Sequence, residues 1–289
     1  MSDIEAIILA LVYLILAPVA GCVLAGVDRK LSARMQGRRG PPIRQPYYDV
    51  RKFMEKEQIT SNGVQDFYVA CYLLFVIVTG CMFFAGMDLL LVLFTLTLGE
   101  TFLILAAYCS GSPFSQVGAQ RELYVAMAYE PILLLAAIAF YLQTGSFAIG
   151  DIASSDGMAV IPLIGVFVAF LYALTMKLRK SPFDLSMSHH VHQDLVRGMT
   201  TEFSGRTLAM LEVSHWYENI MLLALVALFF MDGTWVGFAV GLVVAVLAYL
   251  LEVYIDNGFA RMKWQTALKS GWVVALVLGV GNVIVLLLM

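Results

Sequence analysis

Apolar residues gather along this chain into eight long stretches separated by polar loops. Each stretch is about 20 residues long, which is the length that an α-helix needs to cross a bilayer. The pattern predicts an all-α, polytopic membrane protein with eight transmembrane helices, at roughly 4–27, 67–86, 89–109, 122–142, 159–176, 209–230, 235–254 and 270–289. Because these stretches follow one another closely, we expect a single integral membrane domain over residues 1–289.

The charged residues between these stretches are sorted by sign. All 18 lysines and arginines fall in the first, third, fifth and seventh loops. The other loops carry only acids, at Asp88, Asp151, Asp156 and Asp232. Lys and Arg are retained on the cytoplasmic side of a membrane. We therefore expect cytoplasmic odd-numbered loops, of which loops 1 and 5 are long, both termini outside, and a multi-pass protein of the inner (cytoplasmic) membrane.

Composition narrows the class further. The chain is 61% hydrophobic with a mean hydropathy of +0.84, which excludes an ordinary soluble domain. A net charge of −3 gives no electrostatic support for nucleic-acid binding. The four cysteines are scattered in or near predicted spans and form no C-x-x-C pair, so we expect neither a metal centre nor a disulfide in this chain.

Several ionisable residues fall inside the predicted spans, where a charge is costly and therefore suggests function. The carboxylates are Glu100, Glu130, Glu212, Glu218 and Glu252, and His215 lies between two of them. Glu212, His215 and Glu218 are spaced by three residues and share one helix face. A row of buried protonatable groups is what a proton path requires, although a single buried Glu can equally serve as a polar contact between helices.

The fifth loop holds a second concentration of titratable groups. It contains three of the four histidines, His189, His190 and His192, together with Asp184, Asp194 and Glu202. The spacing H-H-x-H is a poor metal-ligand pattern and no cysteine accompanies it. Because imidazole titrates near neutral pH, we interpret the cluster as a site of proton loading from the cytoplasm. A solvated loop that contacts a partner subunit is the alternative.

The first loop combines dense charges with an amphipathic segment. Its first part, DRKLSARMQGRRGPP, ends at Pro41-Pro42, where a helix cannot continue. After Pro46, the segment YYDVRKFMEKE places Tyr47, Val50, Phe53 and Met54 at helical spacing. This pattern predicts an amphipathic helix at the membrane surface.

These segments resemble the subunit 1 family of respiratory complex I. The first loop carries DRKLSARMQGRRGPP followed by QPYYDVRKFMEKE, the fifth carries PFDL and then TEFSG, and Arg121 precedes Tyr129-Glu130. The resemblance implies eight spans with both ends outside. It also implies that Arg29, Arg38, Asp49 and Lys52 line a cavity under an iron–sulfur cluster of a partner, that Asp184 and Glu202 lie beside it, and that Glu130 and Arg121 belong to a lateral proton path.

Three departures from the complex I pattern favour a particular branch. The Gly-Pro and Gln-Pro of loop 1 are only three residues apart. The run of glutamates after PFD is replaced, with Met187, His189 and Val191 at those places, and Lys177 replaces a glutamate seven residues before Asp184. SHHVHQDL with TTEFSG looks like the equivalent subunit of Ech-type energy-converting (group 4) [NiFe] hydrogenases.

The resemblance implies a non-redox subunit with no catalytic centre of its own. It would dock a soluble arm and couple ferredoxin-linked electron transfer to proton or sodium movement. The expected partners are hydrogenase large and small subunits, iron–sulfur subunits and an antiporter-like membrane subunit, with the NiFe centre and [4Fe–4S] clusters held by those partners. The alternatives are the quinone-site subunit of a complex I-type NADH/quinone oxidoreductase and a stand-alone cation-coupled transporter.

Overall fold

The computed structural model describes residues 3–58, 62–155, 157–187, 195 and 197–288. Its regular elements there are helices, without a β-strand. They are α1 (Asp3–Met35), α2 (Gln45–Glu55), α3 (Gly63–Phe84), α4 (Leu89–Tyr108), α5 (Pro113–Thr144), α6 (Ile149–Ala153), α7 (Ile164–Lys177), η1 (Gly198–Thr200), α8 (Gly205–Leu228), α9 (Trp235–Gly258), α10 (Trp264–Val274), the π-helical turn η2 (Ala275–Val280) and α11 (Gly281–Leu288).

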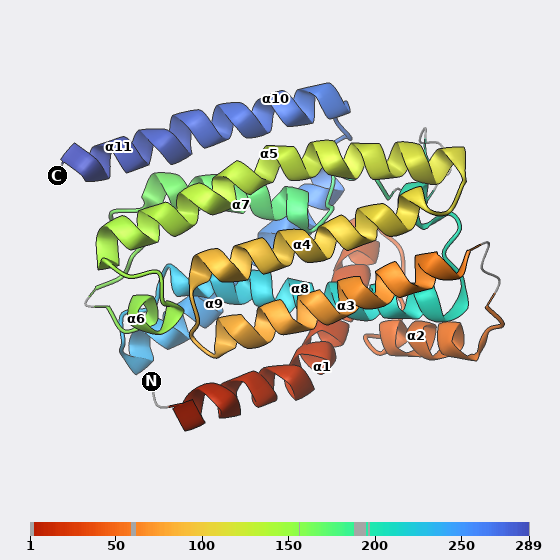
Figure 1. Ribbon diagram of the computed structural model, residues 1–289, viewed down its shortest axis with the longest axis horizontal. Helices are drawn as coiled ribbons and strands as arrows, with labels where there is room; N and C mark the ends of the chain where they lie inside the picture. The colour runs from red at the N-terminus through yellow and green to blue at the C-terminus, as the bar shows by residue number, and fades with distance from the viewer. Residues whose placement is uncertain (1–2, 59–61, 156, 188–194, 196, 289) are drawn as a thin grey trace.

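The long helices run roughly along one axis and form a bundle, and the two termini lie at the same end of it (Figure 1). At the opposite end lie the amphipathic α2 and the start of α8. The prediction of a helix after the Pro-rich break in loop 1 is confirmed: α2 begins at Gln45 and packs against α1 and α8.

Each predicted apolar stretch contains a helix. In the part of the chain that the structure describes, six helices are long and apolar enough to cross a membrane: α1, α3, α4, α5, α9 and the continuous segment Trp264–Leu288. The two remaining predicted spans correspond to α7, which has only 14 residues, and to α8, which carries Glu212, His215 and Glu218. The structure therefore establishes an all-helical protein with six candidate spans.

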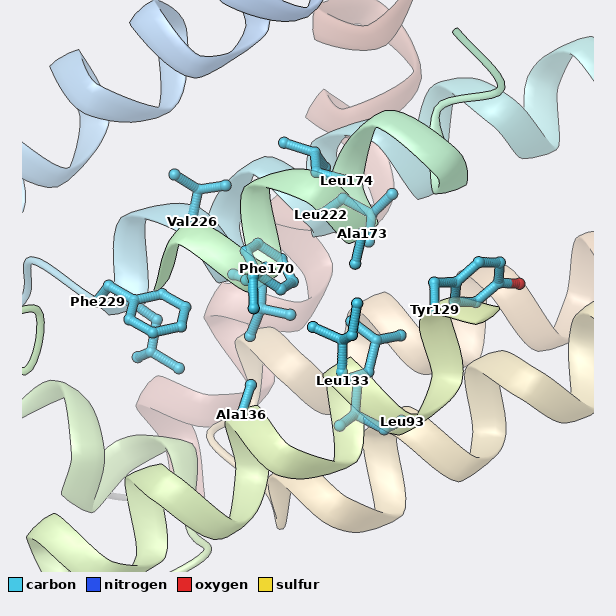
Figure 2. Packing of buried hydrophobic residues seen from close by; sticks show 14 of the residues in the cluster. Leu93, Tyr129, Leu133, Ala136, Phe170, Ala173, Leu174, Leu222, Val226 and Phe229 are labelled. Atoms are coloured by element: carbon cyan, nitrogen blue, oxygen red, sulfur yellow. The ribbon is translucent and has the colours of Figure 1, made fainter. Parts of the chain in front are cut away.

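The helices pack through small residues and a large buried apolar cluster. At Gly271 of α10, an added Cβ would lie only 2.7 Å from the Cβ of Ala128 in α5, so glycine is needed for this close approach. Figure 2 shows the apolar cluster between α4, α5, α7 and α8, with Phe170 and Leu133 near its centre. The Tyr129 ring lies at one edge, and its hydroxyl points away from the other labelled side chains. The apolar packing ends there and polar groups begin.

Candidate functional site

A buried lysine is the centre of the polar region beyond Tyr129. Lys177 is the last residue of α7 and its side chain is almost fully buried. Its ammonium group contacts the carboxylate of Glu100 from α4 and lies 3.1 Å from Oε1 of Glu218 from α8. The Lys177 ammonium also lies 5.1 Å from the centre of the Tyr129 ring. A single cation thus joins two buried carboxylates from helices far apart in the sequence.

Arg179 adds a third carboxylate and a histidine to this arrangement. Arg179 follows α7 with a φ of 52°, a left-handed conformation that turns the chain back toward α5 and α8. Its Nη2 lies 2.8 Å from Oε1 of Glu122 in α5, and its Nη1 lies 3.1 Å from Nε2 of His215 and 3.8 Å from Oε2 of Glu218. Glu218 is therefore shared between Lys177 and Arg179. We call Glu100, Glu122, Glu218, Lys177, Arg179 and His215 the charge network.

Three hydroxyl groups donate further hydrogen bonds to the charge network. The Tyr72 hydroxyl donates to Oε2 of Glu218 over 2.9 Å. The Tyr129 hydroxyl donates to Glu100, and the Ser186 hydroxyl donates to Glu122. Because isolated charges are very costly in a low-dielectric interior, this set of donors is what allows the carboxylates to stay buried.

The formal charges of the network do not balance. Among the described residues of the network, three carboxylates face the two cationic side chains of Lys177 and Arg179, which leaves one negative charge when His215 is neutral and no further proton is bound. One of the carboxylates or His215 can hold that proton, although the Arg179 guanidinium, 3.1 Å from Nε2 of His215, can donate to this nitrogen only while it is unprotonated. The network is therefore a group of connected sites that becomes neutral on taking up a single proton.

A cavity of about 610 Å³ connects this network to the region of loops 1 and 5. Lys177, Arg179 and His215 form part of its wall. The 21 described residues that line it include ten with charged side chains: Asp28, Arg29, Asp49, Lys177, Arg179, Lys180, Asp184, Arg197, Glu212 and Asp256. Charges of both signs line the cavity, which therefore suits water and mobile protons better than an apolar ligand.

Ion pairs hold the outer part of this cavity. Lys180 contacts Asp28 of α1 and lies 3.5 Å from Asp256 of α9, which ties the end of α7 to both helices. Burial alone would lower the pKa of Lys180, but the two neighbouring carboxylates outweigh it and raise this pKa. Arg29 of α1 pairs with Asp49 of α2 at the same rim.

Asp184 differs from these paired acids. It lines the cavity in the loop after α7, and its Oδ1 is buried without a hydrogen-bond partner among the described residues. Burial raises the pKa of Asp184 to about 7, although Arg261 acts in the opposite direction. Asp184 can therefore exchange a proton at physiological pH, next to the Arg179 branch of the network.

The structure brings together some of the residues that the sequence singled out. Arg29, Asp49, Asp184, Glu212 and His215 line the cavity. Glu100 and Glu218 are buried behind it and meet at Lys177. The remaining predicted residues lie elsewhere: the half-buried Glu130 takes no part in the charge network, Arg121 lines a second cavity, and Arg38, Lys52 and Glu202 are not among the cavity-lining residues. His189, His190 and His192 lie outside the described residues.

Sequence reasoning missed two members of the network and undervalued a third. Lys177 was noticed only as a replaced glutamate, while Arg179 and Glu122 were not singled out. One signal for Glu122 was present: it precedes Tyr129 by seven residues, which places both on one helix face. Glu130 is rotated by about 100° from Tyr129, which explains its separation from the network.

Comparisons with known proteins show to which family the chain is similar. The family model described as NADH dehydrogenase matches residues 6–287. The chain is similar to hydrogenase-4 component C of Escherichia coli (29% identity, 91% of this chain and 89% of the relative). It is also similar to formate hydrogenlyase subunit 4 of Escherichia coli (26% identity, 94% and 95%). A subunit of the NADH-quinone oxidoreductase of Methylococcus capsulatus is 32% identical over 63% of this chain and 59% of the relative.

A solved structure gives the same result for the fold. The chain is similar to a subunit of the membrane-bound sulfane sulfur reductase, an archaeal respiratory membrane complex, with a TM-score of 0.84, 27% identity and coverage of 96% and 99%. These relatives are parts of membrane oxidoreductases, and the apolar helices make this chain a multi-pass protein of the inner membrane. With nearly its whole length matched, the chain belongs to the NADH dehydrogenase subunit 1 family, whose relatives here include subunits of hydrogenase and complex I-type complexes.

Proposed function

We propose that this chain is the non-redox membrane subunit of a ferredoxin-linked energy-converting [NiFe] hydrogenase. In this role it crosses the inner membrane eight times with both termini outside. Its cytoplasmic loops 1 and 5 dock the soluble hydrogenase and iron–sulfur subunits, and the bundle couples electron transfer in that arm to proton or sodium movement through an antiporter-like partner. The NiFe centre and [4Fe–4S] clusters belong to the partner subunits.

Relatives of both the hydrogenase type and the complex I type match this chain over most of its length. Two of them, hydrogenase-4 component C and formate hydrogenlyase subunit 4, align over more than nine-tenths of the chain. NADH-ubiquinone and NADH-quinone oxidoreductase subunits align over 97% and 99% of it, at 27% and 28% identity, so the choice of the hydrogenase branch rests on the residues of loops 1 and 5. The complex I pattern has a glutamate at the position of Lys177. This chain therefore differs from that pattern at the centre of the site.

The unbalanced charge network carries the mechanism. A negative charge that arrives in the soluble arm above the cavity makes proton uptake by the network more favourable, because opposite charges attract strongly in a low-dielectric site. The rim groups Asp184, Arg29 and Asp49 lie between the arm and the network. A proton taken up at His215 or Glu218 can then pass to Glu100 around Lys177, which contacts both carboxylates. Coupling further requires that the network has two discrete charge states.

A second candidate function is the quinone-site subunit of a complex I-type enzyme. The full-length matches to NADH-quinone and NADH-ubiquinone oxidoreductase subunits favour it, and a cavity of about 610 Å³ is large enough for a ligand headgroup. Its charged lining disfavours it, because quinone pockets must accept an apolar ring and tail.

Purification of the intact complex from its native membrane distinguishes the two candidates. Mass spectrometry of the co-eluting subunits, together with metal analysis, should find nickel, iron and hydrogenase subunits in stoichiometric amounts. Nickel-free particles with quinone reductase activity would contradict the hydrogenase assignment. Activity of the single purified chain in liposomes would contradict both and favour a stand-alone transporter.

A variant of the charge network tests the mechanism itself. Glu218→Gln keeps the shape of the side chain but cannot release a proton, so hydrogen evolution from reduced ferredoxin should continue while proton uptake into vesicles falls. Glu130→Gln is the informative comparison, because the resemblance places Glu130 on the lateral path whereas the structure places it outside the network. If Glu218→Gln preserves the number of protons moved per hydrogen formed, the network is not the coupling element.

A further inference from the structure

Glu252 is a buried acid that takes no part in the charge network. It lies on α9, one turn before Asp256, and is only 1% exposed, so it does not face the lipid headgroups. Its Oε1 accepts a hydrogen bond from the Thr175 hydroxyl over 3.3 Å. Its Oε2 is buried without a hydrogen-bond partner among the described residues. The bundle therefore contains a further buried carboxyl group with one oxygen atom left unused.

The end of α7 separates this acid from the charge network. Thr175 and Lys177 are two residues apart on α7, and a rotation of about 100° per residue places them about 200° apart around the helix axis. Lys177 contacts two carboxylates of the network on one face, whereas Thr175 contacts Glu252 on the other. The Thr175 hydroxyl also bonds to the carbonyl of Leu171 within α7. Glu252 is therefore held apart from the network, by a donor that is already shared.

Glu252 lies on the face of α9 that forms part of the wall of the cavity of about 610 Å³, which we call the mixed-charge cavity. Tyr249 and Asp256 line this cavity, and Glu252 lies three residues after the first and four before the second, so the three share one helix face. Lys180 and Asp256 interact electrostatically with Glu252. Lys180 is already paired with Asp28 and Asp256, and these three groups together carry a net negative charge. A further negative charge on Glu252 is unfavourable beside them, so this buried acid is stable in its neutral, protonated form.

The same face of α9 is apolar toward the centre of the bundle. Ala248 and Ala245 lie one and two turns before Glu252, and both are buried. Neither can accept or donate a proton, so on this face of α9 a proton can leave Glu252 only toward the mixed-charge cavity. A buried oxygen without a partner beside a polar cavity is a position for an ordered water molecule, which can link it to groups in the cavity wall. A proton that reaches Glu252 is therefore stored there and returns the way it came.

We propose that Glu252 is a proton-storage site of the mixed-charge cavity. It binds a proton at Oε2 and exchanges it, through water, with Asp256 and the other acids of the cavity wall. The step is a simple proton transfer, in which an O–H bond forms on one carboxylate as another breaks, and it needs no oxidant or reductant. The use of this proton by the charge network rests on the proposed coupling function, whereas its storage rests on the geometry of α7 and α9 alone.

Infrared spectroscopy of the intact complex, purified and reconstituted in lipid, tests the storage site without turnover. The C=O stretching band of a protonated carboxylic acid is separate from the bands of carboxylates. The spectrum of the wild type minus that of Glu252→Gln should therefore show such a band at neutral pH. In D2O the band should move to lower frequency, because the stored proton exchanges with water in the cavity. Asp256→Asn should slow this shift, since it removes an exchange partner one turn from Glu252.

A second variant assigns the band to Glu252. Thr175→Val removes the hydrogen bond to Oε1 but keeps the acid, so the band should move to higher frequency and keep its intensity. The matched control is Glu55→Gln, which removes an exposed acid of α2 and should leave this spectral region unchanged. If Glu252→Gln does not assemble, the frequency shift in Thr175→Val identifies the band in its place.

Each contrary result overturns the proposal. A missing band would mean that Glu252 is ionised, and a band that stays unshifted in D2O would mean a sealed acid that only joins helices. Equally fast exchange in Asp256→Asn would mean that the proton leaves by another way, and loss of the band on addition of sodium would mean a cation site. All these measurements use the resting complex. A failure of coupling in the Glu218→Gln experiment would leave them unaffected, so the two proposals can fail separately.

Discussion

The Lys177–Glu218 contact and the Arg51–Glu55 pair of α2 are alike in chemistry but opposite in environment. Their closest N···O distances are 3.1 Å and 3.0 Å. The side chains of Lys177 and Glu218 are each 2% exposed, whereas those of Arg51 and Glu55 are 66% and 65% exposed. The first pair and its contacts come from five helices, α3, α4, α5, α7 and α8, whereas the second connects one turn of a single helix.

The difference shows why the buried pair can respond to a charge change at a neighbouring residue, whereas the exposed pair cannot. Water and salt screen the exposed pair, so its contribution to stability is small and independent of other residues. A buried charge has no such screening, and any change in one member alters the preferred protonation state of its neighbours. Burial therefore turns ordinary ion pairs into a coupled network.

Replacement of Lys177 by Met should have the largest effect. It leaves the carboxylates of Glu100 and Glu218 buried with one fewer cation, and breaking a buried pair in this way lowers the free energy of unfolding by about 3–5 kcal/mol. Thermal unfolding of the solubilised complex measures the change. The double variant Lys177→Met with Glu100→Gln should recover much of the loss, because the second substitution removes the unpaired acid. Wild-type stability of the single variant would contradict the buried pairing.

Asp184 is intermediate between the buried and exposed cases and adds a dependence on pH. Its pKa in the folded protein, about 7, lies above the ordinary value of 3.8, so the folded state binds this proton more tightly than the unfolded state. Its contribution to stability is therefore fully present below about pH 4 and is lost as the pH rises to about 7, at no more than about 1.4 kcal/mol per pH unit. Asp184→Asn should remove that decline.

Unfolding midpoints of the wild type and of Asp184→Asn between pH 4 and 8 provide the measurement. The two proteins should differ least near pH 4, and the advantage of the Asn variant should grow up to about pH 7. A constant difference across this range would mean that Asp184 stays ionised throughout.

Substitutions in loop 1 should have the smallest effect on the free energy of unfolding and the largest effect on assembly with the soluble subunits. Asp49→Ala removes the partly exposed partner of Arg29 and should cost at most about 1 kcal/mol. It should nevertheless weaken co-purification of the soluble arm, because both residues lie at the rim of the cavity. Arg51→Gln is the control from the same helix, with a change of about 0.5 kcal/mol or less. Equal recovery of the soluble subunits with both variants would leave loop 1 without a docking role.

The sequence predicted the helices well because their signals are local. Apolar runs and the Pro-rich break identified a helix in each expected segment, and the amphipathic spacing after Pro46 identified α2. The ends of helices were less predictable. The fourth span was expected to begin at 122, whereas α5 begins at Pro113, since a helix can continue beyond the apolar region when its polar turns have partners. This extension places Glu122 well inside the helix.

The site was less predictable because its contacts are not local. Lys177 meets Glu100 across 77 residues of sequence, and no periodicity links them. Burial arguments drew attention to Glu100 and Glu218, which belong to the charge network, whereas a proline neighbour drew attention to Glu130, which takes no part in it. The roles of these glutamates in proton movement stay predictions. The roles proposed for His189, His190 and His192 stay predictions.

The loop of residues 182–186 contributes to the walls of both cavities. Its Asp184 lines the mixed-charge cavity, while its Leu185 lines the second cavity and accepts a hydrogen bond from Arg261. Arg261 in turn lowers the pKa of Asp184. A change in the charge around Arg261, on one side of this loop, is therefore felt at Asp184 in the wall of the mixed-charge cavity on the other side.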